Sequence, residues 1–335
     1  MTIQTPFGVR IAGTGSAVPD GVLTNADLES MVDTSDEWIV KRTGISERRI
    51  CDPKKGEGAF LLECNAIRAA LEAAEMDASE LDLLILGSLT SEMRCPSNAC
   101  RINAEIGAAP AAAFDLNAAC SGFLYSLNIA DSLIRSGRHR NVGVIGCDVL
   151  SPFIDYNERT VSILFGDAAG AVVLARDDEH PERGCIYQKI EADGRGWESL
   201  YMPRCERDIP ANAAPSDVVI GKLRMNGREV YKFAVKKFQE VIEDALEQTG
   251  LAVDDVAQFV CHQSNVRIIE SAKEKIGLPD DKVYVNIDRF GNSSAGSVGL
   301  CFDQLWRAGK IKRGDHVVLV AFGAGMTWSS SVWRI

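Results

Sequence analysis

The chain has 335 residues, 46% of them hydrophobic, and a formal net charge of -11 at pH 7. This length allows a large core and one or two domains, and the acidic balance argues against non-specific binding of nucleic acid. No run of about 18 apolar residues is present, so we expect neither a transmembrane helix nor a membrane partner.

Ten cysteines are scattered along the chain without a CxxC pair or a zinc-type spacing. A disulfide framework is not expected in a chain this long. The N-terminal stretch MTIQTPFGVRIAG lacks the basic and then apolar profile of a secretory signal. We therefore expect free thiols, a cytoplasmic location and no metal site.

Apolar strands followed by amphipathic helices recur along the chain, which predicts an α/β fold. The polar stretch DDEHPERG, residues 177–184, is the best candidate for a boundary between two halves. We accordingly divide the chain into residues 1–178 and residues 179–335.

The segment DTSDEWIVKRTGI predicts a short helix near the N-terminus. Thr34 and Glu37 form a plausible capping box, and Trp38 lies one turn before Arg42. A Trp beside an Arg can stack on a flat ligand. The alternative is a half-buried Trp that only packs.

One cysteine lies where a strand gives way to a helix. Residues 114–116 are strand-like, residues 121–136 carry apolar residues at helical spacing, and Gly137 follows as a C-cap glycine. Cys120 falls between them. Because a helix N-terminus lowers the pKa of a thiol, this position favours a nucleophile; the alternative is a buried structural cysteine.

Two segments repeat this pattern of helix, basic turn and apolar strand: ADSLIRSGRHRNVGVIG and FDQLWRAGKIKRGDHVVLVAFG. They align Arg135 with Arg307, an offset of 172 residues (307 − 135 = 172). The same offset takes Cys120 to Asn292. Duplicated halves often pack about a pseudo-twofold axis, which would bring equivalent turns together. The alternative is that any two strand-helix units look alike.

His262 is the histidine best placed for chemistry, because it follows the apolar run FVC at a strand end, where sites in α/β sheets gather. A structural histidine is the alternative. For Asn292, the alternative to a functional role is that it only caps the helix that follows. The glycine-rich turn FGAGMTW, residues 322–328, could present backbone N–H groups to an oxyanion.

The helix in REVYKFAVKKFQEVIEDALEQTG places Lys232 and Lys236 on one side. Such a side is usually a solvated face. In a chain with this negative charge, it could instead be a docking patch for an acidic partner.

Five motifs, in order along the chain, carry a resemblance to one known family: TSDEWIVKRTGI, NAACSGFLY, CHQSNVRII, RFGNSSAGS and AFGAGMTW. Together with the Cys-His-Asn combination, they resemble β-ketoacyl-[acyl-carrier-protein] synthase III, the condensing enzyme that initiates type II fatty acid synthesis. The resemblance covers essentially the whole chain. It implies a thiolase-like αβαβα layered fold of two pseudo-equivalent halves, and a homodimer in which strands from AAAFDL pair across the interface.

The resemblance also implies a reaction. Cys120 would take an acyl group from acyl-CoA, and malonyl-acyl carrier protein would then lose CO₂ and attack the thioester. His262 and Asn292 would donate hydrogen bonds to the charge on the malonyl thioester oxygen, and the backbone N–H groups of Cys120 and Ala324 would form an oxyanion hole. His262 would not need to activate Cys120, since the helix N-terminus can lower the thiol pKa. No cofactor is implied, because both thioesters are substrates.

Other positions match family residues one by one. Those implied in CoA binding are Trp38, Arg42, Arg159, Tyr231 and Asn265, with Trp38 and Arg159 sandwiching the adenine. Lys232 and Arg267 match basic residues that dock the carrier protein. Cys95 stands where acetyl-specific relatives have Phe in the partner subunit's acyl pocket, so we expect room for longer or branched primers.

Three alternatives stay open at this point. A Cys-His-Asn thioester hydrolase or acyltransferase uses the same residue types. A non-catalytic protein of the same fold would only bind acyl carriers. Condensing enzymes of secondary metabolism share the fold and the motifs.

Overall fold

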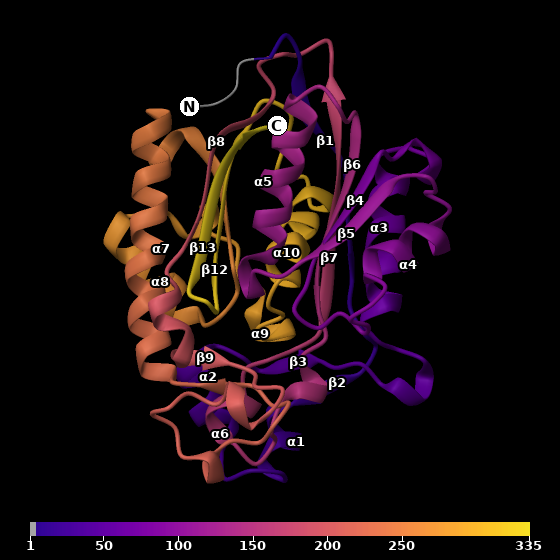
Figure 1. Ribbon diagram of the computed structural model, residues 1–335. Coiled ribbons are helices and arrows are strands. Elements are labelled where there is room, and N and C mark those ends of the chain that lie inside the picture. The colour runs from indigo at the N-terminus through magenta and orange to yellow at the C-terminus, as the bar shows by residue number, and fades with distance from the viewer. Residues whose placement is uncertain (1–4) are drawn as a thin grey trace.

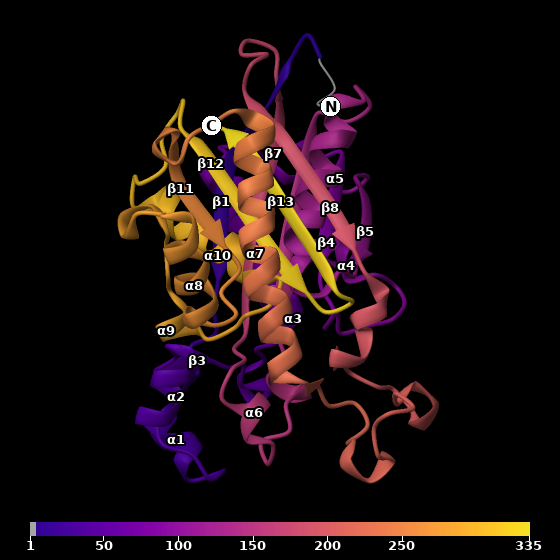
Figure 2. The ribbon, with the colours of Figure 1, turned by 90° about the vertical axis from the view of Figure 1, so that its left-hand side faces the viewer.

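Two β-sheets contain the main apolar strands of the chain (Figures 1 and 2). The structure is a computed structural model that describes residues 5–335, apart from the side chain of Asp217. Residues 1–4, part of the N-terminal stretch in which no secretory signal is recognised, lie outside the described residues.

The first sheet has five strands in the order β1-β7-β6-β4-β5. β4 runs parallel to β5 and β6, whereas β7 is antiparallel to β1 and β6. The strands are β1 Gly8–Ala17, β4 Leu83–Gly87, β5 Ala112–Leu116, β6 Asn141–Asp148 and β7 Ala168–Asp177. β4, β6 and β7 are buried almost throughout, as continuous apolar runs are when both faces of a sheet are covered.

The second sheet repeats this arrangement in the order β11-β12-β13-β8. β11 is parallel to β12, and β13 is antiparallel to β12 and β8. Phe259 of β11 also forms an isolated parallel bridge with Val283, in the place that β5 takes beside β4. The strands are β8 Gly184–Ala192, β11 Val256–Cys261, β12 His316–Gly323 and β13 Thr327–Arg334.

Helices form three layers around the sheets (Figures 1 and 2). α3 and α4 cover the outer face of the first sheet, α7 and α8 cover the outer face of the second, and α5 and α10 lie between them. The helices are α1 Asn25–Glu29, α2 Asp36–Thr43, α3 Ala59–Ala73, α4 Asn98–Ile106, α5 Gly122–Arg135, α6 Arg159–Ser162, α7 Gly227–Thr249, α8 Val266–Ile276, α9 Ile287–Phe290 and α10 Gly296–Arg307. The predicted αβαβα layering with two pseudo-equivalent halves is confirmed.

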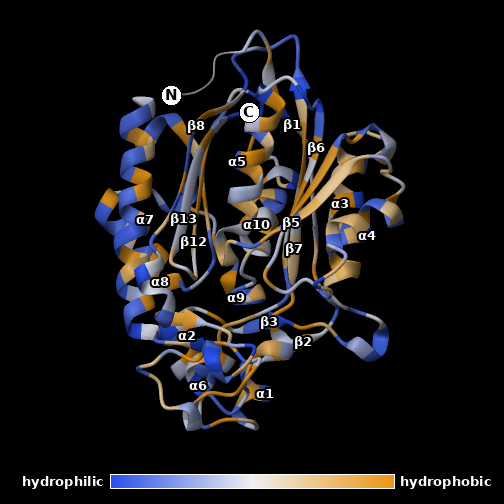
Figure 3. Ribbon diagram, in the orientation of Figure 1, coloured by the Kyte–Doolittle hydropathy of each residue, from blue (hydrophilic) through white to orange (hydrophobic). Residues whose placement is uncertain are grey.

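A smaller region lies at one end of the layers and contains α1, α2, α6 and four short strands (Figure 1). These strands are β2 Val22–Thr24, β3 Glu47–Arg49, β9 Leu200–Tyr201 and β10 Arg224–Met225. β2 pairs with β3, and β9 pairs with β10. The hydrophobic strands of the two sheets and the more hydrophilic outer side of α7 are seen in Figure 3.

The two central helices carry matching ion pairs. Arg135 bonds Asp131 within α5, and Arg307 bonds Asp303 within α10, at 3.0 Å in each case. The second pair lies 172 residues after the first, which is the offset that the sequence repeat predicts (303 − 131 = 172). The repeat is therefore structural and not a chance likeness of two strand-helix units.

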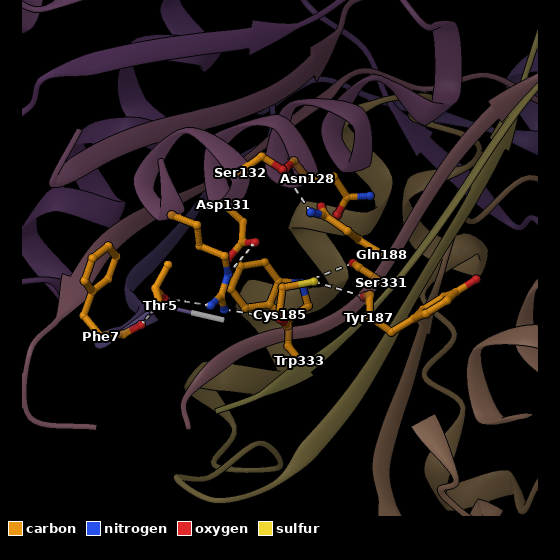
Figure 4. Close-up of polar contacts among 11 residues, drawn as sticks. Thr5, Phe7, Asn128, Asp131, Ser132, Cys185, Tyr187, Gln188, Ser331 and Trp333 are labelled. Atoms are coloured by element: carbon orange, nitrogen blue, oxygen red, sulfur yellow. Dashed lines mark hydrogen bonds and ion pairs between the residues drawn. The ribbon is translucent and has the colours of Figure 1, made fainter. Parts of the chain in front are cut away.

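The contacts that fasten α5 to β8 are shown in Figure 4. Arg135 donates to the carbonyl oxygen of Cys185 at 3.2 Å, and Gln188 Nε2 donates to Ser132 Oγ at 3.0 Å. Asp131 is fully buried, and this burial raises its pKa to about 6 although Arg135 acts in the opposite direction. These contacts fix the helix whose N-terminal end follows Cys120.

The predicted element boundaries are close to those observed. The predicted helix over 121–136 is α5, and the chain passes from the first sheet to the second through the predicted boundary loop, between Asp177 and Gly184. The division into residues 1–178 and 179–335 stays a prediction. The predicted capping box of Thr34 is wrong: α2 begins at Asp36, and Ser35 is its N-cap, accepting from the backbone N of Trp38.

Two kinds of feature are absent from residues 5–335. None of the helices combines the length and the apolar composition needed to cross a membrane. No group of three or more His, Cys, Asp or Glu side chains within residues 5–335 is arranged to hold a metal ion.

Candidate active site

A cavity of about 740 Å³ lies between the two halves of the chain. Cys120, His262 and Asn292 all line it, although they are far apart in the sequence. Cys120 comes from the turn between β5 and α5, His262 follows β11, and Asn292 comes from the turn before α10. The structure thus brings together the three side chains that the sequence singles out.

Cys120 lies in a tight 3-10 turn, Ala119–Ser121, directly before α5. Ala119 has a positive φ of 48°, an uncommon conformation for a residue with a side chain. Gly323 at the end of β12 packs against this turn so closely that a Cβ there would lie 2.7 Å from the backbone N of Cys120. A glycine is therefore required where the two halves meet at the thiol.

Burial governs the pKa of the Cys120 thiol. The residue is 7% exposed, and desolvation raises its pKa to about 12, although a hydrogen bond from Ser294 opposes the shift. Ser294 Oγ donates to Cys120 Sγ at 3.2 Å. The expectation of a lowered thiol pKa is therefore not met at Cys120.

His262 is held by the second half of the chain. Its Nδ1 lies 2.7 Å from Ser297 Oγ, and its ring contacts Phe322 edge to face, with the centroids 5.4 Å apart. Burial lowers its pKa to about 3. The imidazole is therefore neutral at physiological pH and carries a single N–H.

Asn292 both stabilises the local turn and faces the cavity. Its Oδ1 accepts from the backbone N of Ser294 at 2.9 Å, and its own backbone N donates to the carbonyl oxygen of Leu164. Because the amide oxygen is used by the turn, the Nδ2 group is the end left to donate. The capping interpretation and the functional interpretation thus describe the two ends of one side chain.

The turns of Cys120 and Asn292 share a positive φ at the residue before the functional side chain. Ala119 precedes Cys120 with φ 48°, and Gly291 precedes Asn292 with φ 61°. The shared sign of φ agrees with the predicted equivalence, although glycine adopts a positive φ freely and alanine does not. The two halves present different side chains from the same kind of turn.

The ring of Trp38 lies at the edge of the cavity between two arginines. The guanidinium carbons of Arg42 and Arg159 lie 4.5 and 4.7 Å from its centroid. A flat base between Trp38 and Arg159 needs about two contact distances of roughly 3.5 Å, so Arg159 has to move before the predicted sandwich can form. Arg159 now donates to the carbonyl oxygen of Asp33 at 3.0 Å.

Asn265 and the basic residues surround the mouth of the cavity. Asn265 caps α8, and its Nδ2 donates to the carbonyl oxygen of Arg42 at 3.1 Å. It therefore connects α8 to α2 and does not bond His262. Tyr231, Lys232 and Arg267 also line the cavity, and Lys232 pairs with Glu229 at 2.8 Å.

Three predicted residues do not line this cavity: Cys95, Arg159 and Ala324. Cys95 is exposed in the segment between β4 and α4, so within one chain it lies outside the site. Ala324 is adjacent to Gly323, which does line the cavity, and the carbonyl oxygen of Ala324 accepts from Thr327 Oγ1. The oxyanion-hole and primer-pocket assignments stay predictions.

Several residues of the site are not among those predicted from the sequence. Thr160, Arg228 and Ser264 line the cavity, and Ser264 Oγ has no hydrogen-bond partner among the described residues. Arg228 lies in the first turn of α7, where a basic side chain is unfavourable for the helix. This unfavourable position was a sign in the sequence that the side chain of Arg228 has a role in the cavity.

Comparisons with known proteins decide the family. The family described as 3-oxoacyl-[acyl-carrier-protein (ACP)] synthase III matches residues 114–194, and its C-terminal part matches residues 246–335. A β-ketoacyl-[acyl-carrier-protein] synthase III from Caldanaerobacter subterraneus subsp. tengcongensis is 45% identical over 322 residues, 96% of each chain. This chain belongs to the β-ketoacyl-[acyl-carrier-protein] synthase III family.

Solved structures agree with this assignment. The crystal structure of 3-oxoacyl-[acyl-carrier-protein] synthase III from Aquifex aeolicus VF5 has a TM-score of 0.90 and 42% identity, covering 98% of this chain and 100% of that one. The priming β-ketosynthase from the R1128 polyketide pathway also has a TM-score of 0.90, at 34% identity, covering 100% and 98%.

The synthase III family membership confirms the resemblance seen in the sequence and makes the chain a condensing acyltransferase. The alternative of a Cys-His-Asn hydrolase finds no support among these relatives.

Proposed function

We propose that this chain joins an acyl group from acyl-CoA to malonyl-acyl carrier protein, releasing CO₂ and CoA and forming β-ketoacyl-acyl carrier protein. This reaction initiates type II fatty acid synthesis. The observation that carries the proposal is the convergence of Cys120, His262 and Asn292 on one cavity in a synthase III chain. No resident cofactor is needed, because both thioesters are substrates.

The first half-reaction transfers the acyl group to Cys120. The sulfur attacks the acyl carbon, the bond to CoA breaks, and an acyl-enzyme results. Charge on the acyl oxygen in this step is stabilised by the backbone N–H groups of Cys120 and Ala324. The close approach of Gly323 to the Cys120 turn supports this pairing of the two backbones.

The second half-reaction is decarboxylation followed by carbon-carbon bond formation. Loss of CO₂ places negative charge on the malonyl thioester oxygen, and Asn292 Nδ2 donates to it. His262 also lines this cavity, and Nε2 is its free ring nitrogen because Nδ1 bonds Ser297. The enolate then attacks the acyl carbon on Cys120.

The cavity suits a long, narrow thioester arm. Trp38, Arg42 and Arg159 supply an aromatic ring and two positive charges for CoA, while Tyr231 and Asn265 line the passage to the thiol. Lys232 and Arg267 add positive charge at the mouth, which favours docking of an acidic carrier protein.

We also propose a cytoplasmic homodimer. β5 is an edge strand of its sheet, and Phe114 on it is 37% exposed; an apolar open edge of this kind favours pairing with another strand. In such a dimer Cys95 would reach the partner's acyl pocket. Its small side chain leaves room for primers longer than acetyl, which a comparison of rates with acetyl-, isobutyryl- and octanoyl-CoA tests. A strong acetyl preference would refute this part.

The test of the main proposal is incubation with acyl-CoA and malonyl-acyl carrier protein, following CO₂ and the β-ketoacyl product. Cys120→Ala should form no acyl-enzyme by mass spectrometry. Thioester cleavage without a new carbon-carbon bond would contradict the proposal.

A second candidate is priming of a secondary-metabolite pathway. The similarity to the R1128 priming β-ketosynthase supports it. Product formation with a fatty-acid carrier protein, compared with a polyketide carrier protein, discriminates the two functions.

A further inference from the structure

One turn of the second half contacts Cys120, His262 and Asn292. The backbone N of Ser294 bonds Asn292 Oδ1, and Ser294 Oγ bonds Cys120 Sγ. Three residues later, Ser297 Oγ lies 2.7 Å from His262 Nδ1. Ser297 is 1% exposed and does not line the cavity, so it acts on the chemistry only through His262.

The hydroxyl of Ser297 has a second partner. Its Oγ donates to the carbonyl oxygen of Ser294 at 2.9 Å. A serine hydroxyl has one hydrogen and two lone pairs. With that hydrogen given to Ser294, the oxygen can only accept from the imidazole, which requires the hydrogen of His262 to be on Nδ1.

The opposite arrangement makes fewer hydrogen bonds. If Ser297 donated to Nδ1, the carbonyl oxygen of Ser294 would keep only its bond from the backbone N of Ser297, at 3.2 Å. The arrangement with hydrogen on Nδ1 retains that bond and adds both hydroxyl bonds. Burial of all three groups strengthens the preference, because each bond forms away from water.

We propose that Ser297 is a positioning residue that holds the hydrogen of His262 on Nδ1, so that Nε2 is the atom that takes and returns the proton of Cys120. This assignment deepens the proposed function and rests on it.

The acylation step balances with this assignment. The S–H bond of Cys120 breaks and its proton goes to Nε2, while the sulfur electron pair forms the bond to the acyl carbon. The bond between that carbon and CoA breaks, and the CoA thiolate takes the proton from Nε2. His262 returns to its starting tautomer, and its bond to Ser297 is never broken.

The condensation step consumes one proton, which comes from solvent water. Loss of CO₂ leaves the electron pair on the enolate, whose oxygen accepts a hydrogen bond from Asn292 Nδ2. The enolate forms the carbon-carbon bond, the bond from the acyl carbon to Cys120 breaks, and the thiolate takes a proton that Nε2 passes on from a water molecule, with the hydroxide released to solvent. The Nδ1–H group of His262 keeps its hydrogen bond to Ser297 Oγ in both the neutral and the protonated imidazole.

The direct test is ¹⁵N NMR of histidine-labelled protein without substrate. The chain has four histidines, so His262 is assigned by comparison with His262→Gln. Long-range proton-nitrogen correlations should show the Nδ1–H tautomer in the wild type and a changed tautomer ratio in Ser297→Ala. An Nε2–H tautomer in the wild type, or an unchanged ratio in Ser297→Ala, would overturn the proposal.

Kinetics provides a second readout with a matched control. Ser297→Ala should slow acyl-enzyme formation about tenfold, since general-base assistance is partly lost. Ser126→Ala is the control: Ser126 on α5 is fully buried, and its Oγ has no partner among the described residues. Equal rates for Ser297→Ala and the wild type would count against the proposal, even if both proteins fold alike.

Failure of this proposal is distinguishable from failure of the proposed function. The NMR experiment needs no turnover and reports the tautomer alone. Absence of acyl-enzyme in the wild type would refute the proposed function, whereas a wild type that condenses normally with hydrogen on Nε2 would refute only the role of Ser297.

Discussion

The turns that carry Cys120 and Asn292 are two versions of one structure. Each follows a strand or bridge, contains a positive φ, and leads into a central helix with an internal Asp-Arg pair. Only the first places a nucleophile at the helix, while the second places an amide. Duplication therefore produced the scaffold twice, and a change of side chain divided bond formation from charge stabilisation.

Asn292→Ala tests this division of roles most directly. Because Asn292 donates to charge that develops in decarboxylation, its loss should lower the condensation rate about 10²- to 10³-fold. Acyl-enzyme formation should change much less, since the thiol and the imidazole are intact. Single-turnover acylation and CO₂ release, measured on the same preparation, separate the two effects; equal losses in both would contradict the division of roles.

The three central residues of the site were predictable from sequence, and their connections were not. Cys120 and Asn292 follow from the repeat, and His262 follows from its place at a strand end. The bonds through Ser294 and Ser297 depend on how α10 packs against residues far away in the sequence. The raised pKa of Cys120 likewise comes from its burial in the folded chain, which no local sequence pattern indicates.

The two outer helices α3 and α7 differ in what they bury. The buried residues of α7 are all apolar, whereas α3 buries Glu63, whose Oε2 accepts from Asn98 and whose Oε1 has no partner among the described residues. Burial raises the pKa of Glu63 from 4.5 to about 8. The folded protein therefore keeps a proton on Glu63 that the unfolded chain has already released.

Glu63→Gln tests this difference. Between pH 4.5 and about 8 the folded state binds more protons, so the free energy of unfolding of the wild type should fall as pH rises through that window. Gln is uncharged and should remove about 2–4 kcal/mol of this fall. Urea unfolding at pH 5, 7 and 8.5 measures it. Asp131, also raised by burial, is present in both proteins and cancels; parallel curves for the two proteins would refute the assignment.

A smaller effect separates the two positive-φ positions. Gly291 has φ 61° and ψ -160°, a region open essentially to glycine alone, and a Cβ there would lie 2.7 Å from the carbonyl oxygen of Leu164. Gly291→Ala should therefore destabilise the fold by about 1–3 kcal/mol. Ala119→Gly should stay within about 1 kcal/mol of the wild type, because glycine adopts its φ without strain. Thermal unfolding of both variants checks this, and equal stabilities would show that the turns are not constrained differently.

The smallest expected effect concerns exposed charge at the cavity mouth and away from it. Lys232 lies at the cavity mouth, whereas Lys310 follows the C-terminal end of α10, the end opposite Asn292. Lys232→Glu should raise KM for malonyl-acyl carrier protein a few-fold, corresponding to roughly 1 kcal/mol or less for an exposed charge. The effect should shrink as salt is added. Lys310→Glu makes the same charge change away from the mouth and should leave KM unchanged. If both variants raise KM equally, net charge and not a docking surface governs carrier binding, and the basic mouth loses its assigned role.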